Sequence, residues 1–380
     1  MTGFSFRVHD RCPRTHARTG TFTTPHGDVQ TPAFMPVGTR GTVKGVMPRD
    51  LKEAGSTMVL ANAYHLHLRP GDDIVARLGG LHSFMNWDGP ILTDSGGYQV
   101  FSMDDINTVD EDGVTFRSIV DGSPIRLTPE GVMDIERNLG ADVIMAFDHV
   151  PKDPLDKAQV IDATDRTHRW LDRCVKRWRE NGGSDGGQAL FGIVQGGVFE
   201  ATRKASLEAV CSHDLIGYAI GGVSVGEDRE AMRDAVAMTA PYLPEDKPRY
   251  LMGIGTPLDF FDAVERGVDM FDCVTPTRHA RNHQAYTSQG LVNLRNACWK
   301  EDPRPLDPEC VFPPLAGYSR GVLRHLSVTN EMLAGMLLSL QNLWFFHDLM
   351  AQIRDAIREN RLPELRESVL GRVGRKLRPE

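Results

Sequence analysis

The chain has 380 residues, of which 41% are hydrophobic, and its formal net charge is −8. This length and composition allow a large buried core, and the negative charge argues against a protein that coats nucleic acid nonspecifically, because such binding depends on neutralising phosphates. No apolar run approaches the roughly 20 residues that span a bilayer, and residues 1–18 lack the apolar segment of a signal peptide. The six cysteines are scattered without paired spacing. We therefore expect a cytoplasmic protein with reduced thiols and no membrane association.

Short β-rich runs alternate along the chain with segments of helical period. Six of the runs end at or just before a carboxylate, an amide or a glycine, and they are Ile91–Asp94, 141–147 before Asp148, Ala189–Val194 before Gln195, Gly217–Ile220 before Gly221, 250–252 before Gly253, and 267–271 before Asp272. Helices are expected between them over 129–139, 155–181, 201–212, 228–240 and 257–266. This alternation of near-continuous apolar strands with helices predicts an α/β fold, a (β/α)8 TIM barrel. The active site of such a barrel lies at the carboxyl ends of the strands.

The first of these strand ends carries the most informative motif, Asp94-Ser95-Gly96-Gly97-Tyr98. A strand that ends in a carboxylate holds it on a rigid element, and paired glycines allow a flat ligand to approach the backbone closely. Tyr98 offers such a ligand a face for stacking. An ordinary Asp-Ser-Gly turn is the alternative, but the repetition of polar strand ends further along the chain favours a functional site.

The last of these strand ends is followed by basic residues. Arg278 and Arg281 come soon after Asp272, so a negatively charged substrate that reaches this carboxylate would pass them. Further on, residues 323–353 have the apolar periodicity of a helix. We expect a catalytic barrel over 1–295, a C-terminal helical subdomain over 296–350, and a C-terminal helix with a basic tail over 351–380 that closes the barrel.

Longer motifs occur in a fixed order along nearly the whole chain. They include Thr31-Pro32-Ala33-Phe34-Met35-Pro36-Val37-Gly38-Thr39, Tyr64-His65-Leu66-His67-Leu68-Arg69-Pro70-Gly71, Phe191-Gly192-Ile193-Val194-Gln195-Gly196-Gly197, and Phe271-Asp272-Cys273-Val274-Thr275-Pro276-Thr277-Arg278. With these motifs the chain resembles the tRNA-guanine transglycosylase family, in its bacterial form. The resemblance implies a (β/α)8 barrel that exchanges guanine at wobble position 34 of tRNAs with a GUN anticodon for a 7-deazaguanine base, in queuosine biosynthesis. It also implies a homodimer.

The resemblance assigns the chemistry to two carboxylates. Asp272 becomes the nucleophile that attacks C1′ of the ribose and forms a covalent intermediate, and Asp94 becomes the general acid and base. Both roles suit a carboxylate, because displacement at C1′ passes through an oxocarbenium-like state and the departing and incoming bases exchange a proton.

The resemblance also assigns the substrate contacts. Asp148 is expected to accept from N1–H and N2–H of guanine, while Gln195 and the backbone N–H of Gly222 donate to O6. Tyr98 and Met252 are expected to sandwich the flipped base. Other expected base contacts are Val223, Ser95 and Gly253. Arg278 and Arg281 are expected to contact tRNA.

Two departures from the family pattern affect a metal and a substrate. The family holds a structural zinc ion with a Cys-x-Cys-x-x-Cys cluster and a later His, but here these positions are Cys310, Phe312, Leu315 and Gln341. We expect no zinc and no other cofactor, and apolar packing by Phe312, Pro313, Pro314, Leu315 and Trp344 instead.

The second departure lies beside the recognition carboxylate, where His149-Val150 replaces the Glu-Cys of the usual bacterial form. Val150 is the residue typical of enzymes that accept queuine. Val225, in contrast, is the residue typical of the bacterial enzymes that accept preQ1. We favour preQ1 as the incoming base. The alternatives are queuine, a noncatalytic tRNA-binding paralogue, and a barrel enzyme that acts on a small sugar; retention of both Asp94 and Asp272 argues against the noncatalytic paralogue.

Overall fold

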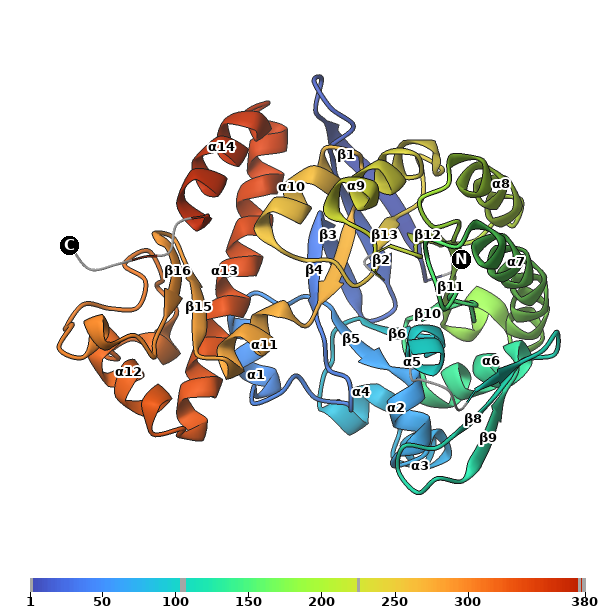
Figure 1. The fold of residues 1–380 in the computed structure, drawn as a ribbon, viewed down its shortest axis with the longest axis horizontal. Coiled ribbons are helices and arrows are strands. Elements are labelled where there is room, and N and C mark those ends of the chain that lie inside the picture. Colours follow the sequence, from blue (N-terminus) through green and yellow to red (C-terminus); the bar gives the residue numbers. More distant parts are fainter. Residues whose placement is uncertain (1–2, 103–106, 224–225, 375–376, 378–380) are drawn as a thin grey trace.

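The computed structural model describes residues 3–102, 107–223, 226–374 and 377. Eight parallel strands form its centre (Figure 1). Their order in the sheet is β4 (Ala33–Pro36), β14 (Met270–Cys273), β13 (Arg249–Leu251), β12 (Gly217–Ile220), β11 (Ala189–Val194), β10 (Val143–Met145), β6 (Ile91–Asp94) and β5 (Val59–Asn62). A parallel bridge between Val37 and Leu60 joins the two outer strands and closes the sheet. The predicted (β/α)8 barrel is confirmed.

The strands are buried on both faces, as their apolar sequences predict. In β11, Phe191 and Ile193 belong to the apolar cluster inside the barrel, whereas Leu190 and Val194 belong to the cluster between the barrel and its helices. Successive side chains of a strand point to opposite faces, so a strand covered on both sides needs apolar residues throughout.

Helices surround the barrel, and those between the later strands lie close to their expected positions. The helix α6 (Pro129–Leu139) has the bounds that the sequence predicts. It begins after Thr128, whose side chain accepts a hydrogen bond from the backbone of Gly131, and it ends at Gly140, whose φ is +73°. Such start and stop residues fix helix ends. The other helices before the last strand are α1 (Pro48–Glu53), α2 (Ala63–Leu68), α3 (Asp72–Arg77), α4 (Gly80–Met85), α5 (Gly97–Ser102), α7 (Lys157–Glu180), α8 (Glu200–Cys211), α9 (Arg229–Ala237) and α10 (Pro257–Val264).

Three small antiparallel sheets were not among the predicted elements. The first covers the amino end of the barrel, where Phe22 and Val29 join the interior apolar cluster. It is tied down by the buried ion pair between Arg18 and Asp269, with an N–O distance of 2.6 Å. The strands of the three sheets are β1 (Ser5–Arg11), β2 (Arg18–Thr24) and β3 (Gly27–Thr31); β7 (Thr108–Val109), β8 (Val114–Arg117) and β9 (Pro124–Leu127); and β15 (Gln284–Thr287) and β16 (Gly290–Asn293).

The C-terminal region corrects one expectation. Instead of one helix over 323–353, there are two, α12 (Arg320–Val328) and α13 (Met332–Arg358), and a final helix α14 (Leu362–Val373). The chain breaks at Asn330, whose φ is +57°, a left-handed conformation that asparagine tolerates better than most residues. The division of the chain at 295 and 350 stays a prediction, and residue 350 lies inside α13. The basic tail that was expected to close the barrel falls largely on residues 375–376 and 378–380, outside the described part of the chain.

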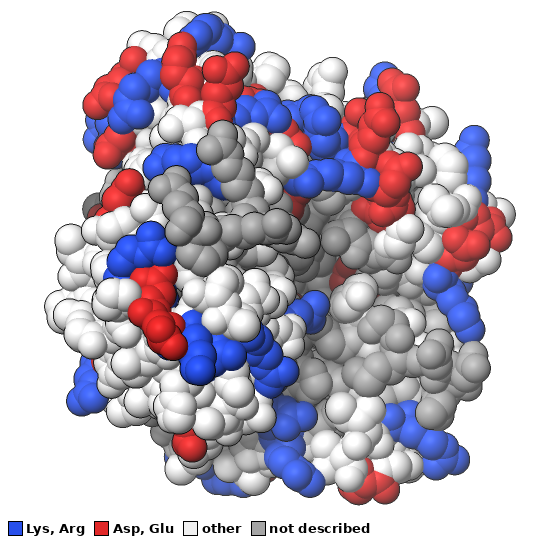
Figure 2. All heavy atoms as spheres, turned by 60° about the vertical axis from the view of Figure 1, so that its left-hand side comes forward, with Lys and Arg blue, Asp and Glu red and all other residues white. Residues whose placement is uncertain are grey.

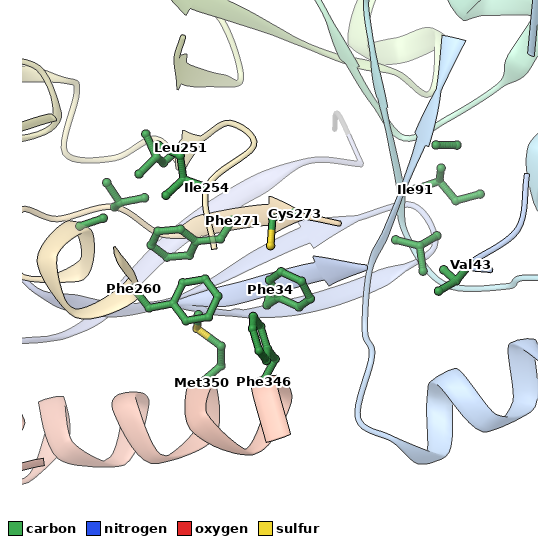
Figure 3. Close-up of a cluster of buried hydrophobic side chains, with 14 of the residues drawn as sticks. Phe34, Val43, Ile91, Leu251, Ile254, Phe260, Phe271, Cys273, Phe346 and Met350 are labelled. Atoms are coloured by element: carbon green, nitrogen blue, oxygen red, sulfur yellow. The ribbon is translucent and has the colours of Figure 1, made fainter. Parts of the chain in front are cut away.

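The helix α13 lies between the barrel and the β15–β16 hairpin (Figure 1). Its Phe346 and Met350 point towards the barrel, where Phe346 meets Phe34 and Phe260 at ring-centroid distances of 5.1 and 5.3 Å (Figure 3). The same helix therefore completes the core of the barrel and supports the C-terminal elements.

All six cysteines are free thiols. Among the residues that the structure describes, no helix has both the length and the apolar character needed to cross a bilayer.

Candidate active site at the carboxyl ends of the strands

Asp94 is the last residue of β6 and is hydrogen-bonded to the neighbouring strand. Its Oδ2 accepts from the side-chain amide of Asn62, at 2.5 Å, and its Oδ1 accepts from the backbone N–H of Ala63, at 3.2 Å. Burial and, to a smaller extent, the charge of Asp272 together raise the pKa of Asp94 to about 7, against the lowering effect of these hydrogen bonds. Both protonation states of Asp94 are therefore populated near neutral pH, as proton transfer in both directions requires.

Asp272 lies in β14 and is buried. Its Oδ1 accepts from the phenol of Tyr250, at 2.6 Å, and from the backbone N–H of Gly253, at 2.7 Å. Burial raises the pKa of Asp272 above its usual range, and these two hydrogen bonds oppose that rise. Within the described residues, Oδ2 accepts no hydrogen bond and is the freer atom for attack on an electrophile.

Asp148 follows β10 and forms a second buried acidic site. Its Oδ2 accepts from Nε2 of Gln195, at 2.6 Å, and its Oδ1 accepts from the hydroxyl of Ser95, at 3.2 Å. Burial raises the pKa of Asp148 to about 6, against both hydrogen bonds. The side chains expected to read guanine therefore lie together, and Gln195 points its amide N–H at Asp148.

Glycines allow this close packing. A Cβ added to Gly97 would lie 2.4 Å from Oδ1 of Asp148, and one added to Gly222 would lie 2.3 Å from Oε1 of Gln195. The φ of Gly222 is also +63°, which favours glycine. Glycine at these two positions therefore lets the backbone pack directly against the carboxylate and the amide.

The other expected base contacts differ in exposure. Tyr98 lies on α5 and is 51% exposed, Met252 is partly buried at the end of β13, and Val223 is buried after β12. Gly253 reaches the site through its N–H to Asp272. Val225 lies outside the described residues.

The residue after Asp148 packs against α5 and α7. The His149 ring lies 4.5 Å from that of Phe101, and its Nδ1 lies 3.1 Å from a guanidinium nitrogen of Arg166. Burial and the Arg166 charge lower the pKa of His149 to about 4, so it is neutral and accepts the Arg166 hydrogen bond. Val150 beside it is buried.

Basic side chains gather beside the strand ends. Arg278 and Arg281 are exposed on α11 (Thr275–Arg281), which directly follows β14. Burial and the nearby charges of Arg281, Arg40 and Arg278 lower the pKa of Lys44, so these four cations form one group. In Figure 2, basic and acidic side chains lie next to one another in several mixed groups on the face that carries the C-terminal elements.

Sequence inspection missed several of these residues. Asn62 and Tyr250 orient the two catalytic candidates, and Arg40 and Lys44 extend the basic group. The sequence gives only a weak signal for these two residues. Asn62 is a polar side chain at the end of an apolar strand and Tyr250 one in the middle of a strand, but their hydrogen-bond partners depend on which strands are paired.

Two groups of residues bear on metal binding. At the positions that hold zinc in the family, Phe312 and Leu315 are buried in the apolar core, and the amide of Gln341 donates to Asp307. One thiol with two hydrocarbon side chains and an amide does not fit a tetrahedral zinc ion.

At the opposite end of the barrel, His26 and His82 each contact one oxygen of buried Asp142, at 2.7 and 3.1 Å. Their rings stack at a centroid distance of 3.6 Å. A metal ion shared by both histidines should lie close to the plane of each ring, and stacked rings do not offer such a position. This group is a hydrogen-bonded link between the β2–β3 hairpin and α4.

The fold and the site together define a (β/α)8-barrel protein whose candidate active site carries acidic groups at the carboxyl ends of the strands. A family model described as Queuine tRNA-ribosyltransferase matches residues 12–375. The chain therefore belongs to the queuine tRNA-ribosyltransferase family, and the resemblance to tRNA-guanine transglycosylases is confirmed.

Curated relatives match over nearly their whole length. The queuine tRNA-ribosyltransferase of Desulforamulus reducens is 50% identical over 364 residues, covering 96% of this chain and 97% of the relative. That of Thermoanaerobacter pseudethanolicus is 49% identical over 99% of both chains, and that of Thermosynechococcus vestitus is 52% identical over 94% of this chain and 93% of its own. The chain is a pentosyltransferase that processes tRNA in queuosine biosynthesis, with tRNA and a free base as substrates.

Proposed function

We propose that the protein exchanges guanine-34 of tRNAs with a GUN anticodon for preQ1 through a covalent intermediate on Asp272. The observation that carries this proposal is the pair of acidic side chains Asp94 on β6 and Asp272 on β14, which lie at the same end of the barrel and have different hydrogen-bond partners. Asp272 is held by two hydrogen bonds to Oδ1, which leaves Oδ2 to attack the sugar. Asp94 has a pKa suited to proton transfer at neutral pH.

The reaction proceeds as two displacements at C1′ of the ribose. In the first, Oδ2 of ionised Asp272 forms a bond to C1′ as the bond to guanine breaks, and protonated Asp94 gives its proton to the departing base. In the second, ionised Asp94 takes a proton from the incoming base, whose nitrogen attacks C1′ and releases Asp272. Two inversions at one carbon retain the configuration of the ribose.

Base recognition requires a rearrangement of the hydrogen bonds around Asp148. The N1–H and N2–H groups of guanine replace Ser95 and Gln195 as donors to this carboxylate. The amide of Gln195 then turns to donate to O6, as does the backbone N–H of Gly222, while Tyr98 and Met252 stack on the base and Val223, Ser95 and Gly253 line the site. Adenine is rejected because it offers the wrong donors and acceptors.

Asp148→Asn should raise the KM for guanine about 10- to 100-fold, because an amide nitrogen faces the donors of the base and a buried hydrogen-bond pairing costs roughly 1–3 kcal/mol when it is mismatched. The measurement is steady-state incorporation of labelled guanine into tRNA. Exposed Asp185→Asn is the matched control and should leave the KM unchanged. An unchanged KM in Asp148→Asn would remove this residue from the recognition site.

The exposed pair Arg278 and Arg281 is proposed to contact the tRNA backbone. Replacing both with alanine should weaken tRNA binding by ~10-fold or more at low salt and reduce the slope of log affinity against log salt by about 2, since two phosphate contacts are lost. Filter binding across a salt series measures both effects. The matched control replaces exposed Arg7 on β1 and Arg179 at the end of α7, away from the strand ends. An unaltered salt slope in the first variant would contradict the assignment.

The test of the proposed activity is exchange of labelled guanine into unmodified GUN-anticodon tRNA. Parallel reactions with preQ1, preQ0 and queuine identify the incoming base. The bacterial form of the chain supports preQ1, whereas buried Val150 supports queuine as the second candidate. A noncatalytic paralogue would bind tRNA and incorporate none of the four bases.

We also propose a cytoplasmic homodimer without zinc or another cofactor. Exposed apolar side chains at the start of α13, Met332, Leu333 and Met336, support a subunit contact there. Sedimentation analysis tests the dimer, and metal analysis of the purified chain tests the absence of zinc.

A further inference from the structure

Asp307 is buried between β16 and α12 and accepts four hydrogen bonds. Its Oδ1 accepts from the hydroxyl of Ser288, at 2.5 Å, and from the backbone N–H of Glu309, at 3.1 Å. Its Oδ2 accepts from the backbone N–H of Ser288, at 2.8 Å, and from the side-chain amide of Gln341, at 3.2 Å. Asp307, Ser288 and Gln341 are called the Asp307 cluster below.

The donors to Asp307 come from three separate segments. Ser288 lies in the turn of the β15–β16 hairpin, Glu309 lies in the loop before α12, and Gln341 lies in the middle of α13. One carboxylate therefore joins three segments that share no continuous secondary structure. A structural metal ion provides the same kind of link in a small subdomain.

The link continues from α13 into the barrel. Gln341 also donates to the backbone carbonyl of Tyr286, at 3.0 Å. The adjacent Asn342 donates to the carbonyls of Pro276 and Gln284, at 2.9 and 3.1 Å, and accepts from the N–H of Tyr286, at 2.7 Å. Because Pro276 belongs to α11, this network also fixes the helix that carries Arg278 and Arg281.

Hydrocarbon side chains occupy two of the positions that would bear zinc ligands. Phe312 and Leu315 are buried in the same apolar cluster as Leu306, next to the Asp307 cluster in the chain. A metal centre that loses its ligands together can be replaced without loss of stability when apolar packing and satisfied hydrogen bonds take over. The Asp307 carboxylate has two donors to each of its oxygens, and Oε1 of Gln341 is the one side-chain oxygen of the cluster that is buried without a partner among the described residues.

We propose that the Asp307 cluster takes the place of the zinc ion as the link between the hairpin turn, the loop before α12, and α13. The subdomain is held together by a buried carboxylate and its donors, and the position of α11 does not depend on a metal. This inference concerns how the chain is held together, so it can fail while the proposed exchange reaction stands.

The first test compares stability in two carboxylate variants of the same loop. Asp307→Asn should lower Tm by roughly 2–4 °C, because an amide group presents its own N–H to buried donors. Glu309→Gln is the matched control, since its side chain is exposed, and its Tm should stay within about 1 °C of the wild type. Gln341→Leu, which removes one donor, should give an intermediate loss. Equal Tm values for Asp307→Asn and Glu309→Gln would overturn the proposal.

The second test uses metal directly. Wild-type protein should contain no stoichiometric zinc by plasma mass spectrometry, and a strong chelator should leave its Tm unchanged. Combining Phe312→Cys, Leu315→Cys and Gln341→His with native Cys310 supplies three thiols and an imidazole. This variant should bind one zinc ion per chain in competition with a chromogenic chelator, and its Tm should then fall on chelation.

The two tests are joined by adding Asp307→Asn to the triple variant loaded with zinc. If zinc and the Asp307 carboxylate both link the same segments, Asp307→Asn should lower Tm in the zinc-loaded variant by less than half as much as it does in the wild type. Stoichiometric zinc in the wild type, or failure of the triple variant to bind zinc, would overturn the proposal.

Discussion

Asp272→Ala should abolish base exchange, with kcat reduced by at least about 10⁴-fold, because the covalent path through C1′ then has no nucleophile. Wild-type protein incubated with GUN-anticodon tRNA should give a slowly migrating band on a denaturing gel, which represents the ester between Asp272 and the ribose. Asp272→Ala should show no such band while still binding tRNA.

The control for this prediction is Tyr250→Phe. It removes one of the two hydrogen bonds to Oδ1 of Asp272 but leaves the carboxylate and the N–H of Gly253 in place. This variant should keep the covalent band and lose about 10-fold in kcat through poorer orientation. A covalent band that persists in Asp272→Ala would place the nucleophile elsewhere.

Asp94→Asn should slow exchange by roughly 10²- to 10⁴-fold, because an amide can neither give a proton to departing guanine nor take one from the incoming base. In the wild type, kcat/KM should fall as pH rises above about 7, where Asp94 loses the proton that guanine departure requires. It should also fall in acid, as Asp272, whose pKa is raised, becomes protonated and ceases to be a nucleophile.

The pH profiles of two variants test this assignment. Asp94→Asn should lose the alkaline limb and keep the acid limb. Asn62→Ala removes a hydrogen bond that lowers the pKa of Asp94, so its alkaline limb should move to higher pH. An alkaline limb that survives in Asp94→Asn would assign the proton transfer to another group.

Sequence patterns predicted the barrel well because its signals are local. β11, β12 and α6 have the predicted bounds, since apolar runs are followed at once by Gln195, Gly221 and Gly140. The antiparallel sheets were missed because short, partly exposed strands depend on their partners more than on their own residues. The break between α12 and α13 was missed because the apolar period continues across Asn330.

The candidate site could be predicted only in part for a related reason. The carboxylates stand at strand ends, which the sequence marks, so Asp94, Asp148 and Asp272 were found. Their partners Asn62 and Tyr250 depend on which strands are neighbours in the closed sheet. Asp307 depends on contacts with Ser288 and Gln341, the second of which is 34 residues away.

The position of α13 has a consequence for modularity. Phe346 completes the aromatic cluster around Phe34 and Phe260. A fragment that stopped at residue 295 would therefore expose an apolar patch on the barrel. The barrel and the C-terminal elements therefore share one core, and neither part can bury its apolar surface without the other.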